Sequence, residues 1–306
     1  MPVPLERQAR EGTEPDEATH CRGMVRRGIT DIGSTERCRP PRRRALDRGL
    51  EATRAESGIS RRRRRAAVRS VAINIAANTN DPGFRGPIQG DGRFEYVPIP
   101  ETEPTRADAD FPTYGDLELD VDASAVADRP VHLDPTFAGV YGCERYTYGD
   151  PYGVKARPLL ALSAGDYVFF YATLSTAAAD PADWLAPVWG AYVIGQFRLA
   201  RDPVPGDAYP DLPPEERAVF ASNAHVKRET FDAAVLLAGD SGASALYERG
   251  VPLSRPGAGA EANRLVTELS SDSGRGPWWR RPLRFGADGT EEIRRLRTGD
   301  RYRAFG

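Results

Sequence analysis

The sequence predicts an α+β protein with a mixed, mostly β core and a few short helices. Strand-like runs of apolar, aromatic and β-branched residues outnumber the segments with a strong helical period. The clearest runs, residues 159–174 and 188–199, follow each other along the chain as two neighbouring strands would. With 306 residues, the chain is long enough to bury a sizeable core.

Charge divides the chain into two parts. Residues 1–70 contain 18 arginines and 10 acidic residues, a balance of +8, whereas residues 71–306 contain 24 basic and 34 acidic residues, a balance of −10. Because residues 1–69 have no sustained hydrophobic period, we expect a disordered, arginine-rich tail, followed by one folded domain over 71–306. The arginine run 61–65 suits contact with phosphates. The alternatives are a solvated tail and sequence translated upstream of the true start.

The composition predicts the cellular compartment of the protein and argues against a membrane span and a disulfide framework. No apolar run approaches the ~20 residues that a membrane span needs, so we expect a cytoplasmic protein with no membrane partner. Cys21, Cys38 and Cys143 form no CxxC pair, so we expect neither a disulfide framework nor a metal site. The acidic, lysine-poor main part suits a high-salt cytoplasm, as in a halophile-like archaeal protein, and GC-rich coding is the other explanation for the excess of arginine over lysine. No motif identifies a cofactor.

Residues 71–101 form the first structured stretch, in which an apolar strand leads into a polar loop and then into a second strand-like run, 94–99. Residues 102–130 are acidic and rich in proline, so they predict an irregular connection. Amide and guanidinium groups at a strand end can recognise hydroxyls or base edges. The substrate-binding candidates in the loop are Asn78, Asn80 and Arg85.

Two histidines are candidates for acid-base catalysis. His132 and Asp134 are two residues apart, so an extended backbone turns both side chains to one side. His225 lies in the segment Ser222-Asn223-Ala224-His225. An imidazole titrates near neutral pH, so either histidine can move protons, and Asp134 can orient the ring of His132.

The middle of the chain predicts a pair of strands. A Gly165-Asp166 turn precedes the aromatic run 167–171, and residues 188–199 form its partner. Gly190 and Gly195 allow bending, which suits either a curved sheet or a small barrel. Further on, Pro213-Pro214-Glu215-Glu216 begins a short helix.

Strand, loop and helix follow once more after residue 232. Residues 233–238 predict a buried strand, and the loop Gly239-Asp240-Ser241-Gly242 offers amides and a hydroxyl to a phosphate. A helix is expected over residues 244–249, ended by Gly250. Thr290 is expected to cap another short helix, with Glu291 and Glu292 in its first turn and arginines near its end.

The C-terminal region is locally basic. Residues 275–303 contain nine arginines and four acids, with aromatic residues between them. Guanidinium groups match phosphates and indoles stack on bases, so nucleic-acid binding is one interpretation, and a charged helix surface with aromatic core packing is the other. The nucleic-acid-binding candidates are Trp278, Arg280, Arg281 and Arg284.

Several motifs together resemble one protein family. They are ANTNDPGFRGPI, FEYVPIPE, HLDP, TYGDP, GDYVFFYATL, SNAH, VLLAGD and VPLS. Together they resemble the nucleotide modification associated domain of the third type, from about residue 71 to the C-terminus. That family occurs in archaea and bacteria and is predicted from genomic context to work beside DNA base modification. The resemblance therefore implies a DNA or nucleotide substrate, with other DNA-modification proteins as partners.

The resemblance also implies further site residues. The motif positions are Asn78, Asn80, Arg85, Gly86, Glu95, Tyr96, Glu101, His132, Asp134, Tyr148, Asp150, Asp166, Tyr171, Asn223, His225, Asp240 and Ser254. Asp150 thereby joins the catalytic candidates, and Tyr96, Glu101, Tyr148 and Tyr171 join the substrate-binding ones. Three functions stay open: an enzyme acting on a base or nucleotide, a non-catalytic reader of modified nucleic acid with a PUA-like barrel, and an interaction protein with neither activity.

Overall fold

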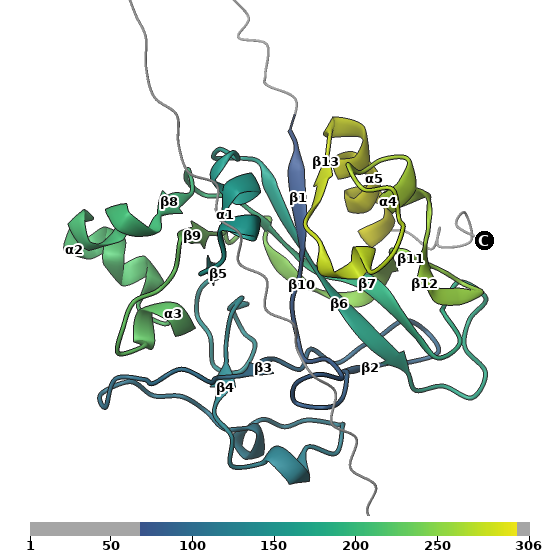
Figure 1. The fold of residues 1–306 in the computed structure, drawn as a ribbon, viewed down its shortest axis with the longest axis horizontal. Coiled ribbons are helices and arrows are strands. Elements are labelled where there is room, and N and C mark those ends of the chain that lie inside the picture. The colour runs from purple at the N-terminus through teal and green to yellow at the C-terminus, as the bar shows by residue number, and fades with distance from the viewer. Residues whose placement is uncertain (1–67, 299–306) are drawn as a thin grey trace, which may run out of the picture. The chain divides into compact units, whose positions relative to one another are not determined.

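The computed structural model describes residues 68–298. These residues form an α+β fold with a mostly β core, which confirms the predicted fold class (Figure 1). The proposed arginine-rich tail up to residue 67 and the last residues of the basic C-terminal region lie outside the described residues. No helix within 68–298 combines the length and the apolar character that crossing a membrane requires.

The main sheet is built around the predicted strand pair. Its strands run in the order β10-β7-β6-β1-β13, with β2 beside β6. They are β1 (Ser70–Asn74), β2 (Pro87–Ile88), β6 (Tyr167–Thr176), β7 (Trp189–Arg198), β10 (Ala245–Pro252) and β13 (Leu283–Phe285). As predicted, β6 and β7 are neighbours, and the structure shows that they run antiparallel. Their register shifts by one residue next to Gly195, where Phe170 pairs with Gly195 and Tyr171 pairs with Val193.

Both faces of this sheet are covered. On one face Phe137, Phe170 and Phe197 pack edge to face, with ring centroids 4.5 to 5.6 Å apart. On the other face lie Trp278 and the apolar side of the helix α5 (Ala287–Arg297). Burial on both faces explains why β6 is a continuous apolar run without alternation.

Smaller sheets and short helices surround the main sheet. A three-stranded sheet has the order β5-β9-β8, and two pairs are β3-β4 and β11-β12. The strands are β3 (Ile99–Pro100), β4 (Val131–His132), β5 (Thr147–Asp150), β8 (Val204–Pro205), β9 (Val235–Ala238), β11 (Ser254–Arg255) and β12 (Ala258–Ala262). The remaining α-helices are α1 (Gly153–Leu160), α2 (Pro214–Arg217), α3 (Ala224–Lys227) and α4 (Arg264–Thr267). Figure 1 shows α2, α3, β8 and β9 on one side of the main sheet, with β3 and β4 below.

Two predicted elements are wrong. Residues 244–249 are not a helix, because 245–252 pair with β7 and extend the main sheet as β10. The run 94–99 is not a continuous strand: Phe94 makes an isolated bridge and only β3 follows. Prolines at 98 and 100 remove backbone donors there, which explains the short ladder.

The other predicted elements are confirmed with adjusted bounds. The run 233–238 is the strand β9, and Pro214 begins α2. The helix expected to be capped by Thr290 begins earlier, at Ala287, with Gly286 at its N-cap. Thr290 therefore lies inside the helix and does not cap it, and its hydroxyl donates to Gly286 O at 2.8 Å.

Candidate functional site

A polar pocket lies where β1, β4, β5 and α3 meet. It has a volume of about 380 Å³. Six of the predicted site residues line it: Asn78, His132, Asp134, Tyr148, Asp150 and His225. The pocket therefore unites the polar loop after β1 with the three motifs that contain His132, Asp150 and His225.

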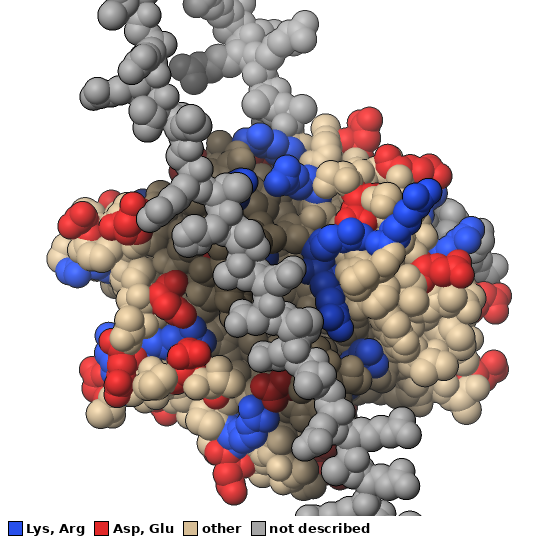
Figure 2. Space-filling view, in the orientation of Figure 1, with Lys and Arg blue, Asp and Glu red and all other residues tan. Residues whose placement is uncertain are grey.

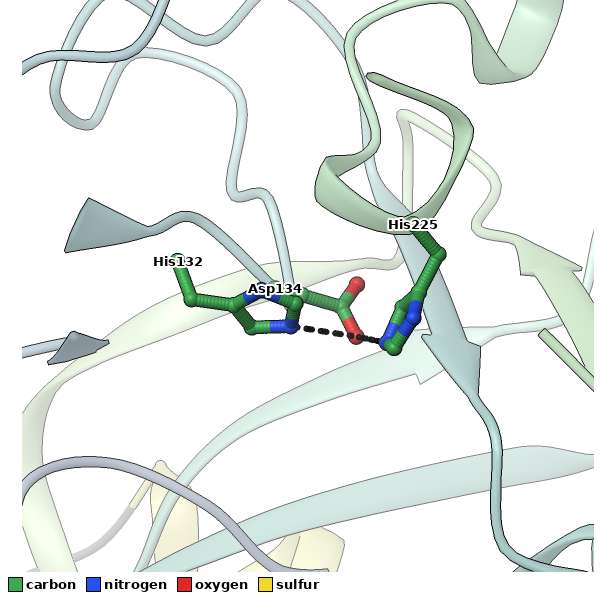
Figure 3. Close-up of side chains that lie close together, drawn as sticks. All are labelled: His132, Asp134 and His225. Carbon is green, nitrogen blue, oxygen red and sulfur yellow. Dashed lines mark ion pairs between the residues drawn. The ribbon is translucent and has the colours of Figure 1, made fainter. Parts of the chain in front are cut away.

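Three side chains meet in this pocket (Figure 3). The Nε2 atom of His225 lies 3.6 Å from Asp134 Oδ2, and the Nε2 atom of His132 lies 4.0 Å from the same oxygen. The two imidazole rings are perpendicular, with centroids 4.8 Å apart. All three residues are buried. The sequence prediction that His132 and Asp134 point to one side is confirmed, and His225 joins them from α3.

Each histidine has a carboxylate behind it. His132 Nδ1 lies 2.6 Å from Glu101 Oε2, and His225 Nδ1 lies 2.8 Å from Asp232 Oδ1. An ionised carboxylate accepts a hydrogen bond from Nδ1–H, so the ring keeps its proton on Nδ1 and a neutral ring has its lone pair on Nε2. Both Nε2 atoms face Asp134 Oδ2. The contacts of Nδ1 with Glu101 and Asp232 therefore favour the tautomer in which the Nε2 lone pairs of both rings point toward this oxygen.

Asp134 is held by donors from two other elements. Asn223 Nδ2 donates to Asp134 Oδ1 at 2.7 Å, and the Gly149 backbone N–H approaches both carboxylate oxygens, at 3.0 and 3.1 Å. Asn223 also caps α3, because its Oδ1 accepts from the His225 backbone N–H at 3.1 Å. One residue therefore orients both the carboxylate and the helix that carries His225.

Arg228 joins the two outer carboxylates. Its guanidinium lies 2.7 Å from Glu101 Oε1 and 2.5 Å from Asp232 Oδ2. Burial raises the pKa of Glu101, but hydrogen bonds from His132 and Arg228 outweigh burial and lower that pKa to about 2. Burial lowers the pKa of His225, yet the Asp134 and Asp232 carboxylates outweigh burial and raise it above its ordinary value.

A second carboxylate group lines the same pocket. Tyr148 donates from its hydroxyl to Asp150 Oδ2 at 2.5 Å, and Lys155 Nζ lies 3.4 Å from that oxygen. Burial, together with the Asp150 and Asp134 carboxylates, holds the pKa of Tyr148 well above its ordinary value. Tyr148 is therefore a hydrogen-bond donor at neutral pH, and Lys155 supplies a cation beside the pocket.

Other predicted site residues lie elsewhere. Arg85 packs over the Trp189 ring at 4.7 Å and donates to Thr173 at 3.3 Å, outside the pocket. The Asn80 backbone N–H donates to Asn78 Oδ1 in an exposed turn. Asp240 and Ser241 line a separate cavity of about 440 Å³.

Three predicted aromatic site residues are buried in the core. Tyr96 donates to Pro135 O at 3.4 Å, and Tyr171 donates to Arg281 O at 2.7 Å. Trp278 is fully buried and its Nε1–H donates to Ala260 O at 2.9 Å, so its indole offers no exposed stacking face. Arg281 forms an ion pair with Asp272 at 3.0 Å, whereas Arg280 and Arg284 are exposed.

Sequence reasoning missed Arg228, Asp232 and Lys155. Arg228 lies three residues after His225, and Asp232 lies seven residues after His225. This spacing matches no familiar motif. Lys155 had a usable signal, because it is one of only two lysines in the chain. A rare ammonium group just after the Tyr-Gly-Asp motif was a reason to include it.

Gly149 gives a direct test of how tightly the site is built. A Cβ atom there would lie 2.7 Å from His225 Cδ2 and 3.1 Å from Asn223 Oδ1. We expect Gly149→Ala to lower the free energy of unfolding by about 1–3 kcal/mol, as overpacking typically does. The control is Gly153→Ala, where no atom lies within 4 Å of the added carbon. Chemical denaturation measures both, and equal stability of the two variants would contradict the described packing.

The fold and the pocket define an α+β protein with a buried His-Asp-His cluster at a polar cavity. The family model described as "Nucleotide modification associated domain 3" matches residues 69–295, so the chain belongs to this family. The family resemblance seen in the sequence motifs is thereby confirmed, and with it a role associated with nucleotide modification. Comparisons with curated proteins and with solved structures give no match.

Proposed function

We propose that the protein is an enzyme that acts on a base or nucleotide during DNA modification, with His132, Asp134 and His225 at its reactive centre. The observation that carries this proposal is the convergence of two carboxylate-backed histidines on Asp134 in a pocket. Buried, oriented imidazoles of this kind are costly to fold and are typical of sites that move protons or bind electrophiles. Membership of a nucleotide modification associated family supports a nucleotide-related substrate.

The other pocket side chains suit a nucleotide. Asn74 and Asn78 line the pocket and offer amide groups that pair with base edges. Lys155 also lines it and can face phosphate or other anionic oxygen. Tyr152 lies at the rim and is 68% exposed, so its ring is available to stack on a base.

Nucleoside mass spectrometry tests the proposal. DNA from cells with the gene, without it, and with the gene replaced by His225→Ala is digested and compared. We expect one modified nucleoside to be lost in both the deletion and the variant. An unchanged nucleoside profile in the deletion strain would overturn the proposal.

A non-catalytic reader is the second candidate, and the exposed Tyr152 beside a polar pocket favours it. A reader that encloses a flipped base needs stacking and hydrogen bonds but no turnover. Under this alternative, His225→Ala leaves the nucleoside profile unchanged and DNA binding largely intact. If the protein is an enzyme, DNA from cells with His225→Ala lacks the modified nucleoside instead.

The exposed arginines near the C-terminus test whether the substrate is polymeric DNA. Figure 2 shows Lys and Arg side chains gathered near the middle of one face, with acidic side chains mostly toward its edges. If Arg280 and Arg284 contact phosphates, the double Ala variant should reduce the slope of log K against log salt by about 1.5–2. Arg255→Ala, which removes an exposed arginine paired with Glu261, is the control. An unchanged slope would indicate a free nucleotide or another surface.

A further inference from the structure

We infer that His132, Asp134 and His225 bind one divalent transition-metal ion, through Nε2 of each histidine and Oδ2 of the aspartate. The ion's catalytic role rests on the proposed function, whereas its binding rests on the geometry alone. The sequence predicted no metal site, because it contains no CxxC pair and no local cluster of ligands. The three residues come together only in the fold, where their ligand atoms lie close enough to hold a metal ion.

The spacing of the ligand atoms suits a metal ion. Asp134 Oδ2 lies 3.6 and 4.0 Å from the two Nε2 atoms, and the three ligand atoms all lie within 4.8 Å of one another. A tetrahedral ion with bonds of 2.0–2.1 Å places its ligands about 3.3–3.4 Å apart. Small side-chain rotations therefore bring the three atoms to bonding distance.

The outer partners of the histidines are those of a metal site. A metal-bound histidine almost always donates its other N–H to a carboxylate, a backbone carbonyl or water, which fixes the ring and makes the ligand more basic. Glu101 provides this contact for His132 and Asp232 provides it for His225. Two histidines from separate elements share the same arrangement, and both turn Nε2 toward one carboxylate oxygen.

The charge balance also calls for a cation. Glu101, Asp134 and Asp232 carry three negative charges, and Arg228 supplies one positive charge among them. The Glu101 and Asp134 side chains are each only 2% exposed, so uncompensated charge there is costly. Two adjacent imidazolium rings, with centroids 4.8 Å apart, would repel each other. One divalent ion balances the remaining charge with both rings neutral.

Two imidazoles and one carboxylate select the class of ion. This donor set suits zinc, iron, manganese or cobalt, whereas magnesium and calcium prefer sites made only of oxygen. Three protein ligands leave further coordination positions on the pocket side. A substrate oxygen or a water molecule can occupy such a position, and a bound water becomes more acidic there.

Metal binding is measured on the full chain after removal of metals by chelation. Cobalt(II) is titrated while its visible absorption is followed, and zinc and manganese are measured by calorimetry. We expect one ion per chain, with binding at least 100-fold weaker in His132→Ala and His225→Ala. The control is His20→Ala, because His20 is the third histidine of the sequence. Failure of the wild type to bind any of these ions would overturn the inference, as would loss of binding in His20→Ala.

A second measurement uses the wild-type chain alone, so its result does not depend on whether the variants fold. The chain has only three histidines, so ring-¹⁵N labelling gives three imidazole spin systems. Addition of zinc should shift the Nε2 signals of two histidines and leave the third unchanged. Unchanged signals for all three would contradict the site. If metal binds but the nucleoside profile does not depend on the gene, the metal site stands and the proposed function fails.

Discussion

Asp134→Asn should reduce the modified nucleoside by more than about 100-fold, beyond the 10- to 100-fold loss typical of an outer partner of a metal ligand. Asn223 donates to Asp134 Oδ1 at 2.7 Å, so the amide oxygen of an introduced asparagine would take that position. Its NH₂ group would then face the two histidines in place of Oδ2. A donor replaces the oxygen that is the proposed third ligand, although the side chain keeps its size.

The measurement is nucleoside mass spectrometry of gene-deleted cells that express each variant at matched levels. Asp240→Asn is the matched control, because this carboxylate lies in a separate cavity. The amount of modified nucleoside with Asp232→Asn should lie between the amounts with Asp134→Asn and Asp240→Asn, since Asp232 contacts Nδ1 of His225 and is not itself a proposed ligand. Full activity of Asp134→Asn would exclude Asp134 from the reactive centre.

Local patterns in the sequence were enough to predict the strand pair and part of the site. The aromatic and β-branched residues of 167–171 suit a strand wherever they are placed, so β6 and its partner β7 were predictable. The relation of His132 to Asp134 depends only on the two-residue period of an extended chain. The prediction of a helix over 244–249 was wrong because these residues pair with the edge of β7. The hydrogen bonds of this pairing outweigh the local helix preference.

The rest of the site depends on long-range pairing. His225 reaches Asp134 because Asn223, 89 residues away in the chain, bonds that carboxylate. Glu101 reaches His132 because β3 pairs with β4, and this pairing places Ile99 opposite His132. No local period encodes either contact, so the sequence suggested separate histidines and no metal. The fold unites them, together with Arg228 and Asp232, which no motif indicated.

Arg228→Met should lower the free energy of unfolding by about 3–5 kcal/mol, the usual cost of breaking a buried ion pair. Arg228 is 10% exposed and Glu101 is 2% exposed, so the methionine would leave a buried carboxylate without its guanidinium. Chemical denaturation in the presence of a chelator measures the effect, because the chelator removes any contribution from bound metal. The control is Arg255→Met, whose pair with Glu261 is more than 60% exposed on both sides, and it should change stability by at most about 1 kcal/mol.

The double variant Glu101→Gln with Arg228→Met separates the ion pair from simple loss of packing. Glu101→Gln removes the negative charge that Arg228→Met leaves uncompensated, so the two losses should not add. We expect the double variant to be more stable than the sum of the single effects predicts, by at least about 1 kcal/mol. Additive losses would show that Arg228 stabilises the fold through its contact with Asp232 and its packing, and that Glu101 needs no guanidinium partner.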